Sequence, residues 1–163
     1  MTPPVRYRDA GVDIDAGEEA VRRIRSHVRS TFNDEVVSDV GAFAGLMRIP
    51  GGDPDRWLVS SIDGVGTKLK VAVMLGRYDT VGEDLVNHCV GDIGVHGADP
   101  LFFLDYVAMG RLEPAVVEQV VAGLARGCRN NGCALIVGEA TAIPGIYTPP
   151  DFEAARRNAK TLR

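Results

Sequence analysis

The residues best suited to chemistry lie in a glycine-containing hexapeptide, Asp63-Gly-Val-Gly-Thr-Lys68, which directly follows an apolar segment. Glycines at such a turn let the backbone approach a ligand closely and direct amide N–H groups toward an anion. A helix that begins just after the loop adds partial positive charge, and Lys68 adds a full one. The residues Asp63, Gly64, Val65, Gly66, Thr67 and Lys68 therefore form a candidate phosphate-binding loop.

The hexapeptide differs from two familiar phosphate-binding sequences. It is not a Walker A loop, because its glycines are not separated by four residues ahead of a Gly-Lys-Thr sequence. It is not the dinucleotide fingerprint, because Leu69 stands where the third glycine belongs. A tight strand-to-helix turn without a ligand explains the local features about equally well.

Three acidic residues are placed so that their side chains can converge. Asp63 follows one expected strand, Glu139 follows another, and Asp92 lies on an intervening helix. Ligands in open α/β sheets gather beyond the carboxyl ends of strands. Carboxylates in that place suit Mg²⁺, which bridges protein oxygens to nucleotide phosphates. Asp92 interrupts an apolar stretch, which favours a functional role, whereas Glu139 alone is equally well explained as a solvated residue.

The histidines and cysteines carry less information. We expect His27 to be solvated on the charged face of a helix. His88 and His96 have no partner at metal-ligand spacing, so we expect a structural role for both. The three cysteines cannot all pair and show no Cys-x-x-Cys spacing, so they are expected to be buried thiols rather than zinc ligands: Cys89, Cys128 and Cys133.

Apolar periodicity along the chain predicts strands that alternate with helices. A side-chain cap at Asp15, with Glu18 three residues on, predicts a helix that ends near Thr31. We expect further helices over 69–75, from Asp79 or Thr80 to Gly97, and over 113–131. Strands are expected over 46–49, 57–62, 101–109 and 133–137. The fold class is therefore α/β (α+β), with a small mixed sheet and helices packed on one face.

Composition excludes several classes of function. The 163 residues are 45% hydrophobic and 25% charged, with a formal net charge of −4, as in an ordinary globular domain. The acidic net charge indicates no basic surface of the kind that binds nucleic acid or an anionic membrane. No apolar run approaches the roughly 20 residues of a transmembrane helix. Without a signal-peptide core at the start, the chain is expected in the cytoplasm.

We divide the chain into three parts. Residues 1–16 are read as an arm that contains Asp9, Asp13 and Asp15, and 17–153 as the domain itself. Residues 154–163 form a basic tail where a regular α/β chain would add another apolar strand. We expect that strand, and a second domain, to be missing.

Several segments, in order, resemble the N-terminal half of the aminoimidazole ribonucleotide synthetase family, also called phosphoribosylformylglycinamidine cyclo-ligases. The similarity runs from Tyr7 to about Ala154. It is carried by Tyr7-Arg-Asp-Ala-Gly-Val-Asp-Ile-Asp15, Asp63-Gly-Val-Gly-Thr-Lys-Leu-Lys70, Asp79-Thr-Val-Gly-Glu-Asp-Leu-Val86, Cys89-Val-Gly-Asp92, Gly97-Ala-Asp-Pro-Leu-Phe-Phe-Leu-Asp-Tyr106 and Pro144-Gly-Ile-Tyr147.

The resemblance implies a chemistry of purine biosynthesis. ATP activates the formamide oxygen of formylglycinamidine ribonucleotide as a phosphoryl imidate, and an internal amine displaces phosphate to close the imidazole ring. By matching positions, residues 63–68 would hold the phosphates and Asp63, Asp92 and Glu139 would bind Mg²⁺. Lys68 and Asp92 would act in catalysis. The arm, with Asp13 and Asp15, would fold over the nucleotide.

The resemblance also implies an architecture: a two-domain α/β subunit whose N-terminal domains pair across a two-fold axis, their sheets joining into a barrel. A homodimer is expected independently, because the predicted sheet has too few helices to cover both faces.

This chain departs from the family pattern at several places. Gly91 stands where Asn is usual, Gly41-Ala-Phe43 replaces Gly-Gly-Phe, and Val137-Gly-Glu-Ala-Thr-Ala142 replaces Gly-Gly-Glu-Thr-Ala-Glu. The family continues into a second domain that helps to bind the ribonucleotide.

Three hypotheses therefore stand. The chain is the ATP-binding half of the cyclo-ligase, completed by a separate second-domain chain. Alternatively, it is a non-catalytic dimerisation or nucleotide-binding module left after truncation. A third alternative is another ATP-using relative, like thiamine-monophosphate kinase or selenophosphate synthetase, which the motifs match less closely.

Overall fold

The computed structural model describes residues 6–147, 152–155 and 158–161. A short 3-10 helix over Tyr7–Ala10 precedes four α-helices and six strands. The helices are α1 (Ile14–Arg29), α2 (Lys68–Leu75), α3 (Asp79–Gly94) and α4 (Pro114–Asn130). The strands are β1 (Gly45–Arg48), β2 (Trp57–Ser61), β3 (Phe102–Met109), β4 (Ala134–Ala142), β5 (Phe152–Ala155) and β6 (Asn158–Thr161).

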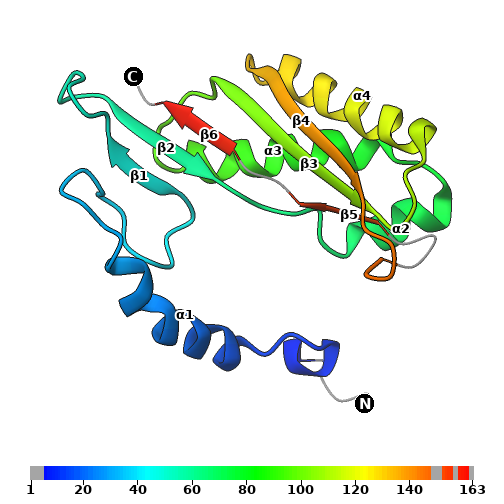
Figure 1. The fold of residues 1–163 in the computed structure, drawn as a ribbon, viewed down its shortest axis with the longest axis horizontal. Coiled ribbons are helices and arrows are strands. Elements are labelled where there is room, and N and C mark those ends of the chain that lie inside the picture. The colour runs from blue at the N-terminus through cyan, green and yellow to red at the C-terminus, as the bar shows by residue number, and fades with distance from the viewer. Residues whose placement is uncertain (1–5, 148–151, 156–157, 162–163) are drawn as a thin grey trace.

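The strands form two three-stranded sheets, in the orders β1-β2-β6 and β4-β3-β5. Strands β3 and β4 are parallel and are connected through α4, whereas the other pairs are antiparallel. Figure 1 shows α3 and α4 lying along the β3–β4 pair. The expected mixed α/β class, with helices against a small sheet, is confirmed.

Glycines allow α3 and α4 to pack with their backbones in close contact. A Cβ atom on Gly123 of α4 would overlap the Asp79 carbonyl oxygen, and one on Gly82 of α3 would overlap the Val120 carbonyl oxygen. Any larger side chain would force the helices apart. Arg126 of α4 adds polar contacts to α3, because its guanidinium donates to Glu83 at 2.5 Å and to Asp79 at 3.1 Å.

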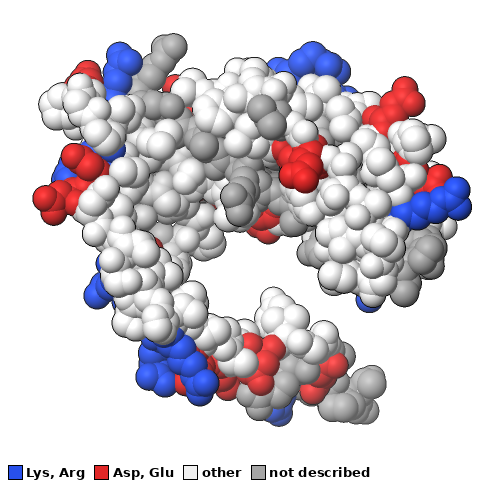
Figure 2. Space-filling model, in the orientation of Figure 1, with Lys and Arg blue, Asp and Glu red and all other residues white. Residues whose placement is uncertain are grey.

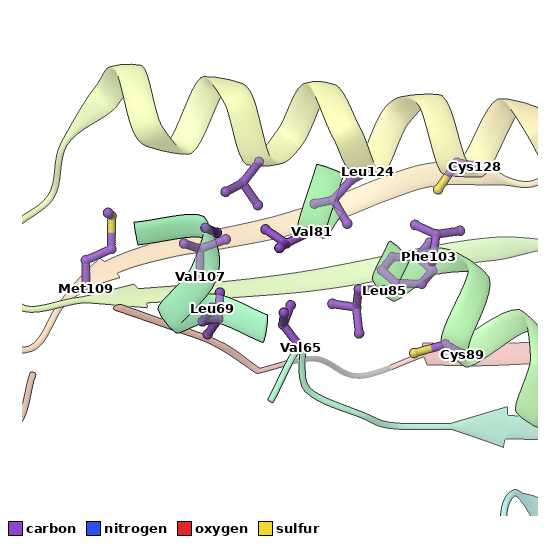
Figure 3. Close-up of a cluster of buried hydrophobic side chains, with 13 residues drawn as sticks. Val65, Leu69, Val81, Leu85, Cys89, Phe103, Val107, Met109, Leu124 and Cys128 are labelled. Carbon is purple, nitrogen blue, oxygen red and sulfur yellow. The ribbon is translucent and has the colours of Figure 1, made fainter. Parts of the chain in front are cut away.

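The main core lies between these helices and the sheet (Figure 3). Phe103 and Val107 of β3 are fully buried against Leu85 of α3 and Leu124 of α4. The expected buried thiols are confirmed at Cys89 and Cys128, while Cys133 is half-buried. A second, smaller cluster contains Ala44, Val59, Ile93 and Ala98, and it attaches the β1–β2 sheet to the end of α3.

Two expected boundaries are wrong at functionally relevant places. The first helix begins at Ile14, with Asp13 rather than Asp15 as its cap: the Asp13 carboxylate accepts from the Ala16 N–H at 3.1 Å. Strand β4 continues to Ala142, so Glu139 lies within the strand rather than after it. Pairing with β3 extends the strand this far, because Tyr106 stands opposite Glu139 and Met109 opposite Ala142.

The expectation that the tail lacks a further strand is also wrong. Residues Asn158–Thr161 pair antiparallel with β2, and Phe152–Ala155 pair antiparallel with β3. Backbone pairing requires no apolar side chain, and a composition argument therefore did not find these strands.

Helix α1 lies away from the rest of the protein (Figure 1). None of its residues is buried, and Ile24 on its apolar face is 47% exposed. Figure 2 shows an open gap between the segment that contains α1 and the sheets, with acidic and basic groups scattered over this face. Asp39 attaches α1 to the next loop by accepting from Arg29 Nε at 3.0 Å and from Arg25 at 3.3 Å.

Candidate functional site

The candidate phosphate-binding loop connects β2 to α2, as the sequence predicts. Gly66 has φ +70°, a left-handed conformation that favours glycine. Val65 is 3% exposed and packs into the main core, which holds the loop in place. Helix α2 begins at Lys68 and has no acidic residue in its first turn. The positive end of its dipole therefore lies at the end of the loop.

Asp63 and Asp92 come together as predicted, and His88 joins them. One ligand atom from each of the three side chains lies within 4.8 Å of the others. The His88 Nε2 atom is 2.5 Å from Asp63 Oδ2. Asp63 Oδ1 accepts from the Gly64 N–H at 2.6 Å, and Asp92 Oδ2 accepts from the Ser61 hydroxyl at 2.7 Å.

The two hydrophobic clusters explain why these side chains meet. Cys89 is fully buried in the main core and Ile93 in the smaller one, so their neighbours His88 and Asp92 lie at the edge of α3. His88 and Asp92 are four residues apart, and a helix therefore presents both on one face. Val59 packs in the same cluster as Ile93, which brings the end of β2 to this face.

Lys68 is engaged by a neighbouring carboxylate. Its Nζ atom forms an ion pair with Asp84 of α3, and both side chains are about half-exposed. A surface ion pair of this kind contributes little stability, so its exchange for a ligand phosphate has a low energetic cost. Lys68 is thus held at the end of the loop and remains within reach of an anion there.

Glu139 is not part of this cluster. It is exposed in the middle of β4 and borders a hollow of about 270 Å³, lined also by Asp105 and by Val117 and Val121 of α4. Among the described residues, the groups that converge for a metal are Asp63, His88 and Asp92. The assignment of Glu139 as a third metal ligand remains a prediction.

The carboxylates of the arm lie on or just before the first helices: Asp9 on the 3-10 helix, Asp13 directly before α1 and Asp15 in the first turn of α1. Asp13 caps the helix, and Asp15 borders a small hollow of about 240 Å³ together with Tyr7 and Val12. Helix α1 stands away from the sheets (Figure 1), and the assignment of Asp13 and Asp15 as nucleotide contacts remains a prediction.

Two residues of the site were not predicted from the sequence. Ser61 is 4% exposed and orients Asp92, but a serine at the end of a strand carries no distinctive signal. His88 was expected to have no partner at metal-ligand spacing, but in the fold its side chain lies beside Asp63 and Asp92; the structural role expected for it remains a prediction. Asp92 lies one helical turn away, and the i, i+4 spacing of the two residues is a signal that could have identified the pair.

The fold and the site together define a mixed α/β domain in which a glycine turn opens beside converging carboxylates. Comparison with known proteins specifies the family. The model of the AIR synthase related protein, N-terminal domain, matches residues 41–153, and the chain belongs to this family.

Two curated relatives with the same name are similar to this chain. The phosphoribosylformylglycinamidine cyclo-ligase of Synechocystis sp. is 52% identical over 149 residues, which are 91% of this chain and 44% of the relative. That of Sorangium cellulosum is 54% identical over 151 residues, which are 93% of this chain and 43% of the relative. The chain thus spans less than half the length of the relatives it matches.

Solved structures share the fold at low sequence identity. The structure of tt0281 from Thermus thermophilus has a TM-score of 0.69 at 21% identity and covers 93% of this chain and 46% of that one. AaThiL complexed with AMPPCP and TMP has a TM-score of 0.67 at 13% identity, covering 92% and 44%. T. maritima PurL complexed with ADP has a TM-score of 0.58 at 15% identity, covering 96% and 26%.

Proposed function

We propose that this chain is the ATP-binding half of a phosphoribosylformylglycinamidine cyclo-ligase. The two relatives of this name described above are 52% and 54% identical to it over more than nine-tenths of its length. One observation of the site carries the proposal: the carboxylates of Asp63 and Asp92 converge at the start of the glycine loop that leads into α2. An anion-binding turn beside divalent-cation ligands suits a magnesium nucleotide.

The loop and the two carboxylates would each bind a different part of ATP with Mg²⁺. The backbone N–H groups of the loop would hold phosphate oxygens, while Asp63 and Asp92 would hold the metal, which offsets the phosphate charge. Lys68 would exchange Asp84 for a phosphate oxygen. Asp92 would be kept in orientation by Ser61, in the same way that ligand carboxylates are commonly hydrogen-bonded.

The proposed reaction is ring closure of formylglycinamidine ribonucleotide to aminoimidazole ribonucleotide. Phosphorylation of the formamide oxygen creates a leaving group, and the internal amine then displaces phosphate. What this chain's residues contribute is positioning and charge stabilisation at the phosphates. The portion of the relatives that this chain does not cover would supply further contacts to the ribonucleotide, as a second domain or a separate chain.

A titration of the chain with Mg-ATP tests the nucleotide site. Asp63→Asn should remove most of the Mg²⁺-dependent binding, because it removes a charged metal ligand while keeping the size of the side chain. Asp53→Asn, in the exposed turn over 51–54, is the matched control and should bind as the parent does. Equal affinity of Asp63→Asn and parent in calorimetry would contradict the assignment.

Glu139 is tested in the same assay. If β4 brings this carboxylate to the metal when nucleotide binds, Glu139→Gln will weaken Mg-ATP binding as Asp63→Asn does. An unchanged affinity would remove Glu139 from the proposed metal ligands.

We also propose a homodimer. Large apolar side chains are exposed on several elements, including Ile136 of β4 at 55%, Ile62 at 64% and Phe43 at 79%. Exposed apolar groups of this size are typical of interfaces. Light scattering at micromolar concentration should give about twice the chain mass of 17.4 kDa, and a monomer mass from folded protein would contradict the proposal.

The alternative function is a nucleotide-binding or dimerisation module without catalysis. The replacements in β4, where Ala140 and Ala142 stand at positions that usually carry Thr and Glu, favour it. The main proposal includes a cytoplasmic location for the protein. Within the described residues, no helix has the length and apolar character needed to cross a membrane.

A further inference from the structure

We propose that Asp63, His88 and Asp92 form a cation site that binds a first-row transition-metal dication directly, without nucleotide, and in preference to Mg²⁺. The inference shares Asp63 and Asp92 with the proposed nucleotide site. It adds a nitrogen ligand, His88, and thereby changes the chemistry of the metal.

The arrangement of donor atoms carries the proposal. One atom from each side chain lies within 4.8 Å of the other two, a spacing that a single ion can bridge. Two of the ligands are a helical turn apart on α3, and the third follows β2. The core fixes both parts, because Cys89 and Ile93 hold α3 and the buried Val65, two residues after Asp63, holds the loop.

Supporting hydrogen bonds orient both carboxylates. Asp92 is held by the hydroxyl of Ser61, which is 4% exposed, and Asp63 by the N–H of Gly64. Neighbours of this kind orient ligands in metal sites and strengthen binding. A pair of surface charges needs no such support, since exposed ion pairs tolerate many geometries.

The donor set indicates the class of metal. Mg²⁺ prefers oxygen ligands in octahedral geometry, whereas imidazole nitrogen suits metals of the first transition row. The side chains of His88 and Asp63 are 49% and 39% exposed, so one side of the site is open to water or to a phosphate oxygen. The site therefore has three protein ligands and an open side.

Direct titration of the full chain with Mn²⁺, Co²⁺ or Mg²⁺, without nucleotide, tests the inference. We expect Mn²⁺ and Co²⁺ to bind at least tenfold more tightly than Mg²⁺. His88→Gln should weaken Co²⁺ binding by about 10-fold or more and change the visible absorption of bound Co²⁺, with Mg²⁺ affinity within about twofold of the parent. His27→Gln, on exposed α1, is the matched control and should change neither metal.

Two results would overturn the inference. One is a Co²⁺ affinity and spectrum unaffected by His88→Gln, which would leave the cluster as an ion pair only. The other is binding of Mg²⁺ as tightly as Co²⁺ by the parent chain. Because no nucleotide is present in this titration, neither result contradicts the proposed Mg-ATP site. Conversely, an unchanged Mg-ATP affinity of Asp63→Asn would not contradict binding of the metal alone.

A measurement on the parent protein makes the test independent of variant folding. The chain has three histidines, so their imidazole resonances can be assigned and followed during Mn²⁺ addition. Broadening of His88 at substoichiometric Mn²⁺, with His27 on α1 unaffected, supports the site. Equal broadening of His27 and His88 contradicts it.

Discussion

At the scale of single residues, the candidate site depends on hydrogen bonds that orient its charged groups. Ser61 and Gly64 each hold one carboxylate, and Asp84 holds Lys68 at the end of the loop. None of these contacts is strong alone. Their effect is to keep the donor atoms of Asp63 and Asp92 within a few ångströms of each other before any ligand arrives, which lowers the entropic cost of binding.

Ser61 provides a prediction at this scale. Ser61→Ala removes the hydroxyl that orients Asp92, and Mg-ATP affinity should fall by about tenfold, as it does when a supporting partner of a metal ligand is lost. Ser60→Ala, at the adjacent half-buried position on β2, is the control and should bind normally. Calorimetry on both variants makes the comparison, and equal affinities would show that Ser61 has no orienting role.

At the scale of elements, two contacts have different energetics: the packing of α3 on α4, and the ion pairs of Asp39 with Arg25 and Arg29, which tether α1 to the next loop. The helices meet through glycines within the main core, where contacts are close and water is excluded. Helix α1 is tethered by exposed charges at Asp39. The first contact should therefore govern global unfolding, whereas the second should depend on pH and salt.

Gly123→Ala should destabilise the protein by about 1–3 kcal/mol or more, because its Cβ would overlap the Asp79 carbonyl and the helices must separate. Gly94→Ala is a control in open space at the end of α3. It should be neutral or stabilising by about 0.4–1 kcal/mol. Urea denaturation of both variants measures the difference. A Gly123→Ala midpoint equal to that of the parent would contradict the packing described.

The tether of α1 should respond to acid. Hydrogen bonds from Arg29, together with the Val40 N–H and the charge of Arg25, lower the pKa of Asp39 to about 2. The pKa of an aspartate in the unfolded chain is about 3.9, so the ionised carboxylate stabilises the folded contact fully above that pH. The stabilisation is lost as the pH falls through the folded pKa of about 2. Attachment of α1 should therefore weaken between about pH 4 and pH 2.

A carboxyl-detected NMR titration of Asp39 checks this expectation. Salt should raise its midpoint, because exposed ion pairs are screened. Asp39→Asn should free α1 at neutral pH while leaving the core unchanged. An Asp39 midpoint near 4 would show that the tether does not form.

At the scale of the whole molecule, the chain presents a folded core with its candidate site open to solvent. Helix α1 stands apart (Figure 1), and Gly64, Gly66 and Thr67 of the glycine loop are exposed. Relatives are more than twice as long, since this chain covers 43–44% of them. A second copy and the remaining portion of such a relative are the proposed partners that would enclose the site.

Turnover by this chain alone should therefore be undetectable. Correct positioning of reactants can account for roughly 7–11 kcal/mol of barrier lowering, and half of the proposed enzyme would leave the formamide unpositioned. The assay supplies formylglycinamidine ribonucleotide, Mg²⁺ and ATP and follows formation of aminoimidazole ribonucleotide. A rate within tenfold of a full-length relative would contradict this expectation.

Much of the fold could be predicted from the sequence because the signals are local. Apolar periodicity located the helices and strands from β1 to β4, and the glycine loop was placed between β2 and α2. The motifs that resemble the cyclo-ligase family are also contiguous segments, and the family is confirmed. Some errors at this level concern ends, as at Asp13, where a cap two residues earlier offers an equally good hydrogen bond. The sequence analysis also missed β5 and β6, which have no apolar periodicity.

Tertiary structure decided which side chains meet. The sequence by itself placed Asp63 after a strand and Asp92 on a helix, but burial of Cys89 and Ile93 on that helix brings His88 and Asp92 to Asp63. The length of β4 was decided by pairing with β3, which places Glu139 within a strand and outside the cluster. Such contacts depend on packing between distant segments, and no local pattern encodes the energy of that packing.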